Sequence, residues 1–231
     1  MPVTDITALR NAVKLQPEGD RKAGALKVHG HRWAARAALL VGAQRAAEHH
    51  TRAWLTLNGP ATDSQTAAAL QTLAYLLARR GASEAYAEAT TLLERATDLQ
   101  PQAAAAWFNL GYVQQQAGQH AAALGALRQA LALSPELDRA WYGLGLSLLQ
   151  LGQTAEALEA FQTNTRLQPH SPHGWAGCAR AQLQLGDAEA ARATLDHLRQ
   201  FEPRAARALQ LELQAAWPQA FQPLPRLEGD T

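Results

Sequence analysis

The chain has 231 residues, a formal net charge of +1 and a single cysteine, Cys178. A charge this close to zero, with no long basic or acidic run, excludes the electrostatic footprint of a nucleic-acid-binding protein, and one cysteine excludes a disulfide framework. Aromatic residues make up only 6% of the sequence, and much of its 47% hydrophobic content is alanine. This composition favours helices over strands.

The N-terminus contains no apolar stretch of signal-peptide length. The longest apolar run, residues 33–43, is interrupted by Arg36 and is too short to cross a bilayer. We therefore expect a cytoplasmic protein with no membrane span. The frequent use of alanine, glutamine and arginine favours a bacterial source.

Residues 1–60 form an N-terminal segment with a degenerate helical pattern. The first 17 residues look like the second half of a helix hairpin. Helices are then expected at about 28–41 and 44–57, with Gly42 in the turn between them. Whether this segment contains true repeats stays open at the level of sequence.

From residue 67 the chain repeats itself with a period of 34 residues. Fixed self-similarity of this length is typical of a repeat array, in which each unit packs on its neighbours. The recurring positions include the tryptophans and prolines Trp107, Trp141, Trp175, Pro135, Pro169 and Pro203. We divide the region into four repeats, 67–103, 104–137, 138–171 and 172–205. The first is three residues longer, so a longer turn is expected near residues 81–86.

Each repeat is predicted to be a pair of antiparallel helices. Glycines such as Gly118 and Gly152 follow the first helix and can adopt the left-handed conformation that ends it. A proline ends the second helix, because the residue before proline is disfavoured in the α region. Small residues are expected where the two helices cross: Gly111, Gly145, Ala179, Ala123, Ala157 and Ala191.

After the last repeat, residues 206–217 are expected to form a capping helix with Leu209, Leu213 and Trp217. Such a helix covers the last apolar face of an array. Residues 218–231 are rich in proline and are expected to be a disordered tail.

These patterns resemble the tetratricopeptide repeat family. The first clean repeat matches the family pattern at Trp107, Leu110, Gly111, Ala123, Leu127, Ala130 and Pro135. The later repeats depart from it at Asn164 (for Ala), Cys178 (for Leu), Ala179 (for Gly) and Leu198 (for Ala). The resemblance implies an all-α, right-handed superhelical solenoid of antiparallel helix pairs, with a concave groove lined by the first helix of each pair. It also implies binding of a protein or peptide rather than catalysis.

On each first helix, the residues opposite the tryptophan face would point into that groove. The resulting peptide-binding candidates are Gln71, Tyr75, Arg79, Phe108, Asn109, Tyr112, Gln116, Arg139, Tyr142, Leu146, Gln150, His173, Arg180 and Gln184. This set contains aromatic, amide and guanidinium groups but no carboxylate. Tyrosine and arginine dominate binding hot spots, and arginine pairs well with carboxylates. A partner with acidic residues or a free C-terminus is the resulting hypothesis.

The predicted function is a non-catalytic interaction module: an adaptor, co-chaperone or assembly factor. Two alternatives stay open. One is a self-assembling scaffold, or homo-oligomer, whose terminal helices pair between copies; the other is an accessory domain of a larger enzyme complex.

No catalytic, metal or cofactor site is predicted. Within one helix, neither His29 with His31 nor His49 with His50 places both rings on one face, and nearby ligands do not complete a metal set. Cys178 falls at a core position, where a free cysteine behaves as a small apolar residue.

Overall fold

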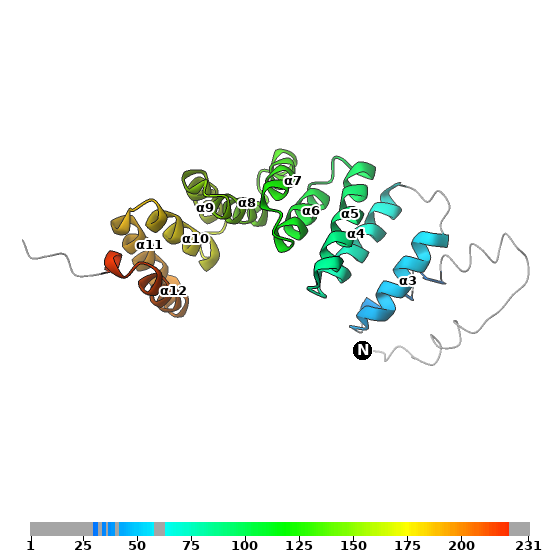
Figure 1. The fold of residues 1–231 in the computed structure, drawn as a ribbon, viewed down its shortest axis with the longest axis horizontal. Helices are drawn as coiled ribbons and strands as arrows, with labels where there is room; N and C mark the ends of the chain where they lie inside the picture. The colour runs from blue at the N-terminus through cyan, green and yellow to red at the C-terminus, as the bar shows by residue number, and fades with distance from the viewer. Residues whose placement is uncertain (1–29, 32–33, 36, 40–41, 58–62, 222–231) are drawn as a thin grey trace, which may run out of the picture. The chain divides into compact units, whose positions relative to one another are not determined.

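The computed structural model describes residues 30–31, 34–35, 37–39, 42–57 and 63–221 (Figure 1). The expected half-repeat of residues 1–17 lies outside these residues. The chain divides into two units, residues 1–101 and 102–231, and each is described by itself. This division lies near the end of the first of the four predicted repeats, residues 67–103.

The described residues of unit 1 include three long helices: α3 (Gln44–Leu57), α4 (Asp63–Ala78) and α5 (Ser83–Leu99). The bounds of α3 are those predicted for the helix after Gly42, whose φ of +72° lies in the left-handed region. The described residues between 30 and 39 are also helical.

The extra residues of the first repeat do not form a long turn. They lengthen the second helix of the pair instead: α5 has 17 residues, against 14 in α7. The turn between α4 and α5 therefore stays short. The expectation of a long turn near residues 81–86 is wrong, because a run such as Ser83–Leu99 has no helix-breaking glycine or proline.

The core of unit 1 lies between these helices. Leu70, Leu73 and Leu77 of α4 are buried, as is Trp54 of α3. Arg52 of α3 also donates hydrogen bonds from Nη2 to Oε2 of Glu88 in α5 at 2.9 Å. Apolar burial and a charge-assisted bond thus both hold α3 onto its neighbours.

Unit 2 consists of three helix pairs, a further helix and a short 3-10 turn. The pairs are α6 (Ala104–Gln116) with α7 (His120–Leu133), α8 (Asp138–Gln150) with α9 (Thr154–Leu167), and α10 (Pro172–Gln184) with α11 (Ala188–Phe201). Each helix packs against the next one in sequence, and α6, α8, α10 and α12 also pack side by side in that order. We call α6, α8, α10 and α12 the A helices.

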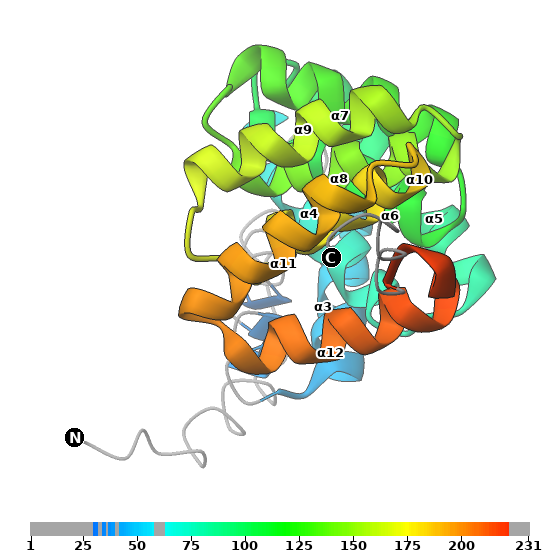
Figure 2. The same ribbon diagram turned by 90° about the vertical axis from the view of Figure 1, so that its left-hand side faces the viewer.

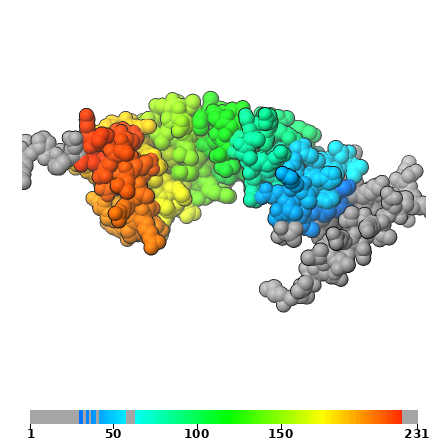
Figure 3. All heavy atoms as spheres, turned by 60° about the horizontal axis from the view of Figure 1, so that its bottom comes forward, coloured from blue at the N-terminus to red at the C-terminus, as the bar shows by residue number. Residues whose placement is uncertain are grey.

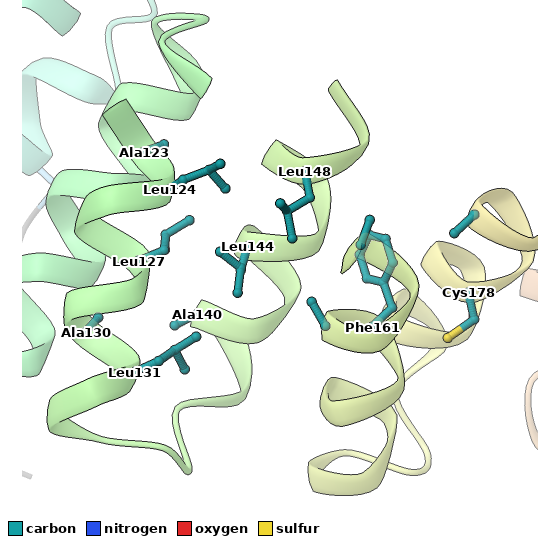
Figure 4. Packing of buried hydrophobic residues seen from close by; sticks show 13 residues of the cluster. Ala123, Leu124, Leu127, Ala130, Leu131, Ala140, Leu144, Leu148, Phe161 and Cys178 are labelled. Atoms are coloured by element: carbon teal, nitrogen blue, oxygen red, sulfur yellow. The ribbon is translucent and has the colours of Figure 1, made fainter. Parts of the chain in front are cut away.

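Small residues let the paired helices approach closely, as predicted. A Cβ at Gly111 would lie 2.7 Å from Cγ of Leu127, and one at Gly145 would lie 2.6 Å from the ring of Phe161. Ala123 and Ala157 are fully buried. On its other side, α7 faces α8 of the next pair, and Figure 4 shows Leu124, Leu127 and Leu131 at that contact.

Two tryptophans near the start of their helices donate hydrogen bonds to the turn that precedes the helix. The indole Nε1 of Trp141 donates to the carbonyl oxygen of Pro135 at 2.8 Å, and Trp175 makes the same bond to Pro169. Their rings are half-buried against the cores of unit 2. The tryptophan and the proline of the repeat pattern are therefore bonded to each other.

The capping helix begins earlier than predicted. Helix α12 spans Pro203–Ala216, and Glu202 alone separates it from α11. Proline is well tolerated at the first helical position, where its missing N–H has no partner to lose. Pro203 therefore ends one helix and starts the next.

The segment after α12 is not disordered at its start. Residues Pro218–Phe221 form a 3-10 helix, η1, beside the end of α12 (Figure 2). Arg192 of α11 donates to the carbonyl oxygen of Ala220, which attaches η1 to the helix pair. Figure 3 shows α11, α12 and η1 in orange and red at one end of unit 2. Residues 222–231 lie outside the described residues.

Within the part of the chain that the structure describes, no helix is long and apolar enough to cross a lipid bilayer.

Candidate functional site

The predicted binding residues of unit 2 lie on one face of the A helices, which we call the A-helix face. On α6, Phe108 and Asn109 are half-buried, Gln116 is exposed, and Tyr112 is 48% exposed. Tyr112 is therefore the most prominent aromatic side chain of this helix. An exposed tyrosine presents both a flat apolar ring and a hydroxyl group to a ligand.

Helix α8 places a guanidinium group over the aromatic residues of α6. Cζ of Arg139 lies 5.1 Å from the centroid of the Phe108 ring, in cation–π geometry. Arg139 is exposed. Among the described residues no carboxylate pairs with Arg139, so its charge is available to a ligand.

In the middle of α8, Tyr142 contacts both the A-helix face and the core of unit 2. The ring of Tyr142 lies 5.8 Å from that of Phe161 and 5.8 Å from that of His173 in α10, centroid to centroid. Burial raises the pKa of Tyr142, and the charge of Arg180 opposes that shift. The tyrosine is therefore neutral, and its hydroxyl lies within electrostatic reach of Arg180. Leu146 is half-buried against the core of unit 2, while Gln150 is exposed.

Helix α10 contributes His173, Arg180 and Gln184. His173 and Gln184 are exposed, and Gln184 accepts a hydrogen bond from Thr154 at 3.2 Å. Arg180 is paired with Glu212 of α12: Nε donates to Oε1 at 2.8 Å and Nη2 donates to Oε2 at 2.9 Å.

This ion pair corrects the expectation of a face without carboxylates. The prediction treated α12 only as a cap, but α12 packs beside α10 as one more A helix. Its Glu212 therefore reaches the face. The bond raises the pKa of Arg180 and lowers the pKa of Glu212.

One residue of the face was not singled out from the sequence. Nε2 of Gln115 in α6 donates to the carbonyl oxygen of Gly143 at 2.6 Å and to Oγ of Ser147 at 2.8 Å, both in α8. A Cβ at Gly143 would lie 3.2 Å from Oε1 of Gln115. The amide thus spans two A helices, and only the packing of α6 on α8 reveals the pairing.

Two of the predicted residues of unit 1, Gln71 and Tyr75, belong to α4, and Arg79 directly follows its last residue. Gln71 is half-buried, Arg79 is exposed, and Tyr75 is 56% exposed. Nη1 of Arg79 lies 3.4 Å from the hydroxyl of Tyr75, and its Cζ lies 5.7 Å from the centroid of that ring. Arg79 and Tyr75 therefore form a local pair at the C-terminal end of α4.

Unit 1 also has an apolar cavity that the sequence did not indicate. It has a volume of about 350 Å³ and opens between α3, α4 and the helical residues before Gly42. Trp54 and Thr51 of α3 line it together with Leu39 and Ala68. The predicted residues Gln71, Tyr75 and Arg79 do not line this cavity.

His31 and His50 contact each other, although the sequence analysis compared each only with its neighbours along the chain. Nδ1 of His31 lies 3.0 Å from Nδ1 of His50, so one ring donates and the other accepts. Burial lowers the pKa of His50, with smaller contributions from His31 and His49. Among the described residues no group of three or more potential ligands is placed to hold a metal ion.

Cys178 occupies the core position that the sequence predicted. It is 3% exposed, and burial raises the pKa of its thiol to about 12. A thiol in this state has almost no thiolate at neutral pH, and the thiolate is the reactive form.

Comparison with known proteins supports the repeat reading of the chain. Tetratricopeptide repeat profiles match residues 77–138, 111–172 and 148–215, which together cover more than half of the chain. A search of curated protein sequences finds no significant match.

Solved structures with the same fold include three described proteins. One is "MamA 41-end from Desulfovibrio magneticus RS-1", with 22% identity, a TM-score of 0.70, and coverage of 77% of this chain and 96% of that chain. A second is YrrB, described as a tetratricopeptide repeat protein with an unusual peptide-binding site, with 21% identity, a TM-score of 0.69 and coverage of 90% and 98%. The third is pilF of Pseudomonas aeruginosa, with 20% identity, a TM-score of 0.61 and coverage of 84% and 94%.

These likenesses confirm the predicted fold class, an all-α solenoid of antiparallel helix pairs. The sequence profiles cover the helix pairs of unit 2, in which glycines such as Gly111 and Gly145 pack closely on the partner helix. The chain is therefore a member of the tetratricopeptide repeat family.

Proposed function

We propose that this protein is a non-catalytic interaction module that binds an acidic segment of a partner protein on the A-helix face of unit 2. It would act in the cytoplasm as an adaptor, co-chaperone or assembly factor. The observation that carries the proposal is Arg139, an exposed cation stacked on Phe108 with no carboxylate partner among the described residues.

The surroundings of Arg139 support a ligand with both charge and apolar parts. Phe108 and Tyr112 of α6 offer aromatic surface, and Tyr142 and His173 extend it across α8 and α10. Arg139 is held in place by the ring beneath it, so less side-chain freedom is lost when a carboxylate binds. Arginine and aromatic residues in this combination are typical of binding hot spots.

Self-assembly through the last helix has less support. Helix α12 exposes one large apolar side chain, Leu211, at 61%. A single exposed leucine is ordinary on a protein surface and does not by itself mark an interface. We therefore favour a partner of different sequence over a second copy of this chain.

The test begins with a phage library of short random peptides selected on the immobilised full chain. Selected peptides are then titrated against the wild type, Arg139→Gln and the double variant Arg139→Gln with Tyr112→Ala. We expect acidic residues to be enriched, and Arg139→Gln to weaken binding by about tenfold or more. Because Arg139 and Tyr112 are exposed, the melting temperature should stay nearly unchanged.

Arg166→Gln is the matched control. Arg166 is an exposed arginine of α9, and its Nη2 donates a hydrogen bond to Oγ1 of Thr163 in the same helix. Peptides that bind Arg139→Gln and wild type equally would disprove the proposed site.

A further inference from the structure

The second arginine of the A-helix face differs from the first in having its own carboxylate. Arg180 and Glu212 form two parallel hydrogen bonds of 2.8 and 2.9 Å. This bidentate geometry is the one in which arginine binds a carboxylate most strongly. Glu212 thus occupies the position that the carboxylate of a ligand would need.

The charge of the face is therefore uneven along the A helices. At the α6–α8 end, Arg139 lies over Phe108, and no carboxylate in the described part of the chain pairs with it. At the α10–α12 end, Arg180 is neutralised by Glu212, whose side chain is 53% exposed. An acidic group arriving there meets the Glu212 carboxylate, and like charges brought together weaken binding.

We infer that Glu212 selects against acidic residues at the α10–α12 end of the face, so that the ligand is a segment with its acidic part over α6–α8 and an uncharged or basic residue over α10–α12. This inference rests on the proposed function and adds the order of charges along the ligand. Glu212 acts as a specificity-determining residue because it repels one class of ligand, in addition to the attraction supplied by Arg139.

The contribution of the Arg180–Glu212 ion pair to folding stability is too small to explain why the two residues are paired. Both side chains are partly exposed, at 32% for Arg180 and 53% for Glu212. Pairs of this kind contribute little to folding in water. The packing of α12 comes instead from Leu209 and Leu213, which are buried in the core shared with α10 and α11. Glu212→Gln should therefore fold normally, which makes it a usable probe.

The experiment repeats the peptide selection on the full-length Glu212→Gln variant. Without the carboxylate, Arg180 becomes a second free cation. We expect the selected peptides to carry a second acidic residue, and these diacidic peptides to bind Glu212→Gln about three- to tenfold more tightly than wild type. Adding Arg180→Gln should remove that gain. Glu159→Gln, on an exposed position of α9, is the control and should select the same peptides as wild type.

The possible results separate the two proposals. If wild type and Glu212→Gln select the same peptides, and those peptides depend on Arg139, the inference about Glu212 is wrong while the proposed function stands. If no peptide depends on Arg139, the proposed function fails and this inference fails with it. A gain that survives Arg180→Gln would also overturn the inference, because it would not come from the released arginine.

Discussion

Asn164 of α9 occupies the space that a side chain would need at Gly174 of α10. A Cβ built on Gly174 would lie 2.3 Å from Oδ1 of Asn164. Nδ2 of the same amide donates to the carbonyl oxygen of Asp138 at 2.8 Å, whereas the buried Oδ1 accepts no hydrogen bond from any described residue. The family pattern has alanine at position 164. The larger Asn164 side chain fits here because the neighbouring helix has a glycine, Gly174, beside it.

Replacing Gly174 by alanine should therefore destabilise the protein through a steric clash. We expect Gly174→Ala to cost about 1–3 kcal/mol of unfolding free energy. The cost should be smaller in an Asn164→Ala background, where the amide is gone and Cγ2 of Thr165, 2.9 Å from that Cβ, is the remaining close neighbour. Urea unfolding of the two single variants and the double variant measures this coupling. Additive effects would show that the two side chains do not compete for space.

Phe161 should be the most costly aromatic residue of unit 2 to truncate. It is fully buried, and its ring fills the space beside Gly145 and Gly177. Figure 4 shows it in α9 within the cluster that includes Leu148 and Cys178. Phe161→Ala should cost about 3–5 kcal/mol, as measured by denaturant unfolding.

Phe108→Ala provides the comparison, because Phe108 is half-buried and lies on the A-helix face. It should cost clearly less stability than Phe161→Ala. Equal losses for the two variants would contradict the assignment of Phe161 to the core and Phe108 to the binding face.

The thiol of Cys178 should be unreactive in the folded protein. Burial raises its pKa to about 12, so a thiol reagent at neutral pH should label it only after denaturant is added. The neutral thiol favours the folded state, and this contribution is lost as pH rises from about 9 towards 12. In Cys178→Ala, the fall of unfolding free energy over that range should be smaller. Rapid stoichiometric labelling in native buffer would contradict the burial.

The carboxyl group of Glu212 should titrate below its usual value of 4.5, because Arg180 donates hydrogen bonds to its charged form. The small stabilisation from a lowered carboxyl pKa is present above that usual value and is lost as pH falls through the lowered one. An NMR titration of the Glu212 side-chain carbon in wild type and in Arg180→Gln measures the shift. The pKa should rise in the variant, and identical titration curves would show that the ion pair does not form in solution.

The repeat period alone predicted much of this fold. Tryptophan, glycine and proline at constant spacing predicted a series of helix pairs. The structure shows these pairs in unit 2, from α6 (Ala104–Gln116) to α11 (Ala188–Phe201). The reason is local: a glycine with positive φ such as Gly118 or Gly152 ends a helix wherever it occurs. The burial of Leu110 and Leu144 follows from helical spacing in the same way.

The contacts between helices were decided only by the tertiary structure. Arg180 meets Glu212, His31 meets His50, and Gln115 reaches Gly143 across separations that the repeat period does not specify. Each pairing depends on how one helix is rotated and offset against another, and that offset is set by the side chains packed between them. Spacing within the sequence thus determined which residues share a face, whereas packing determined that one arginine of the face, Arg180, is neutralised and the other, Arg139, is not.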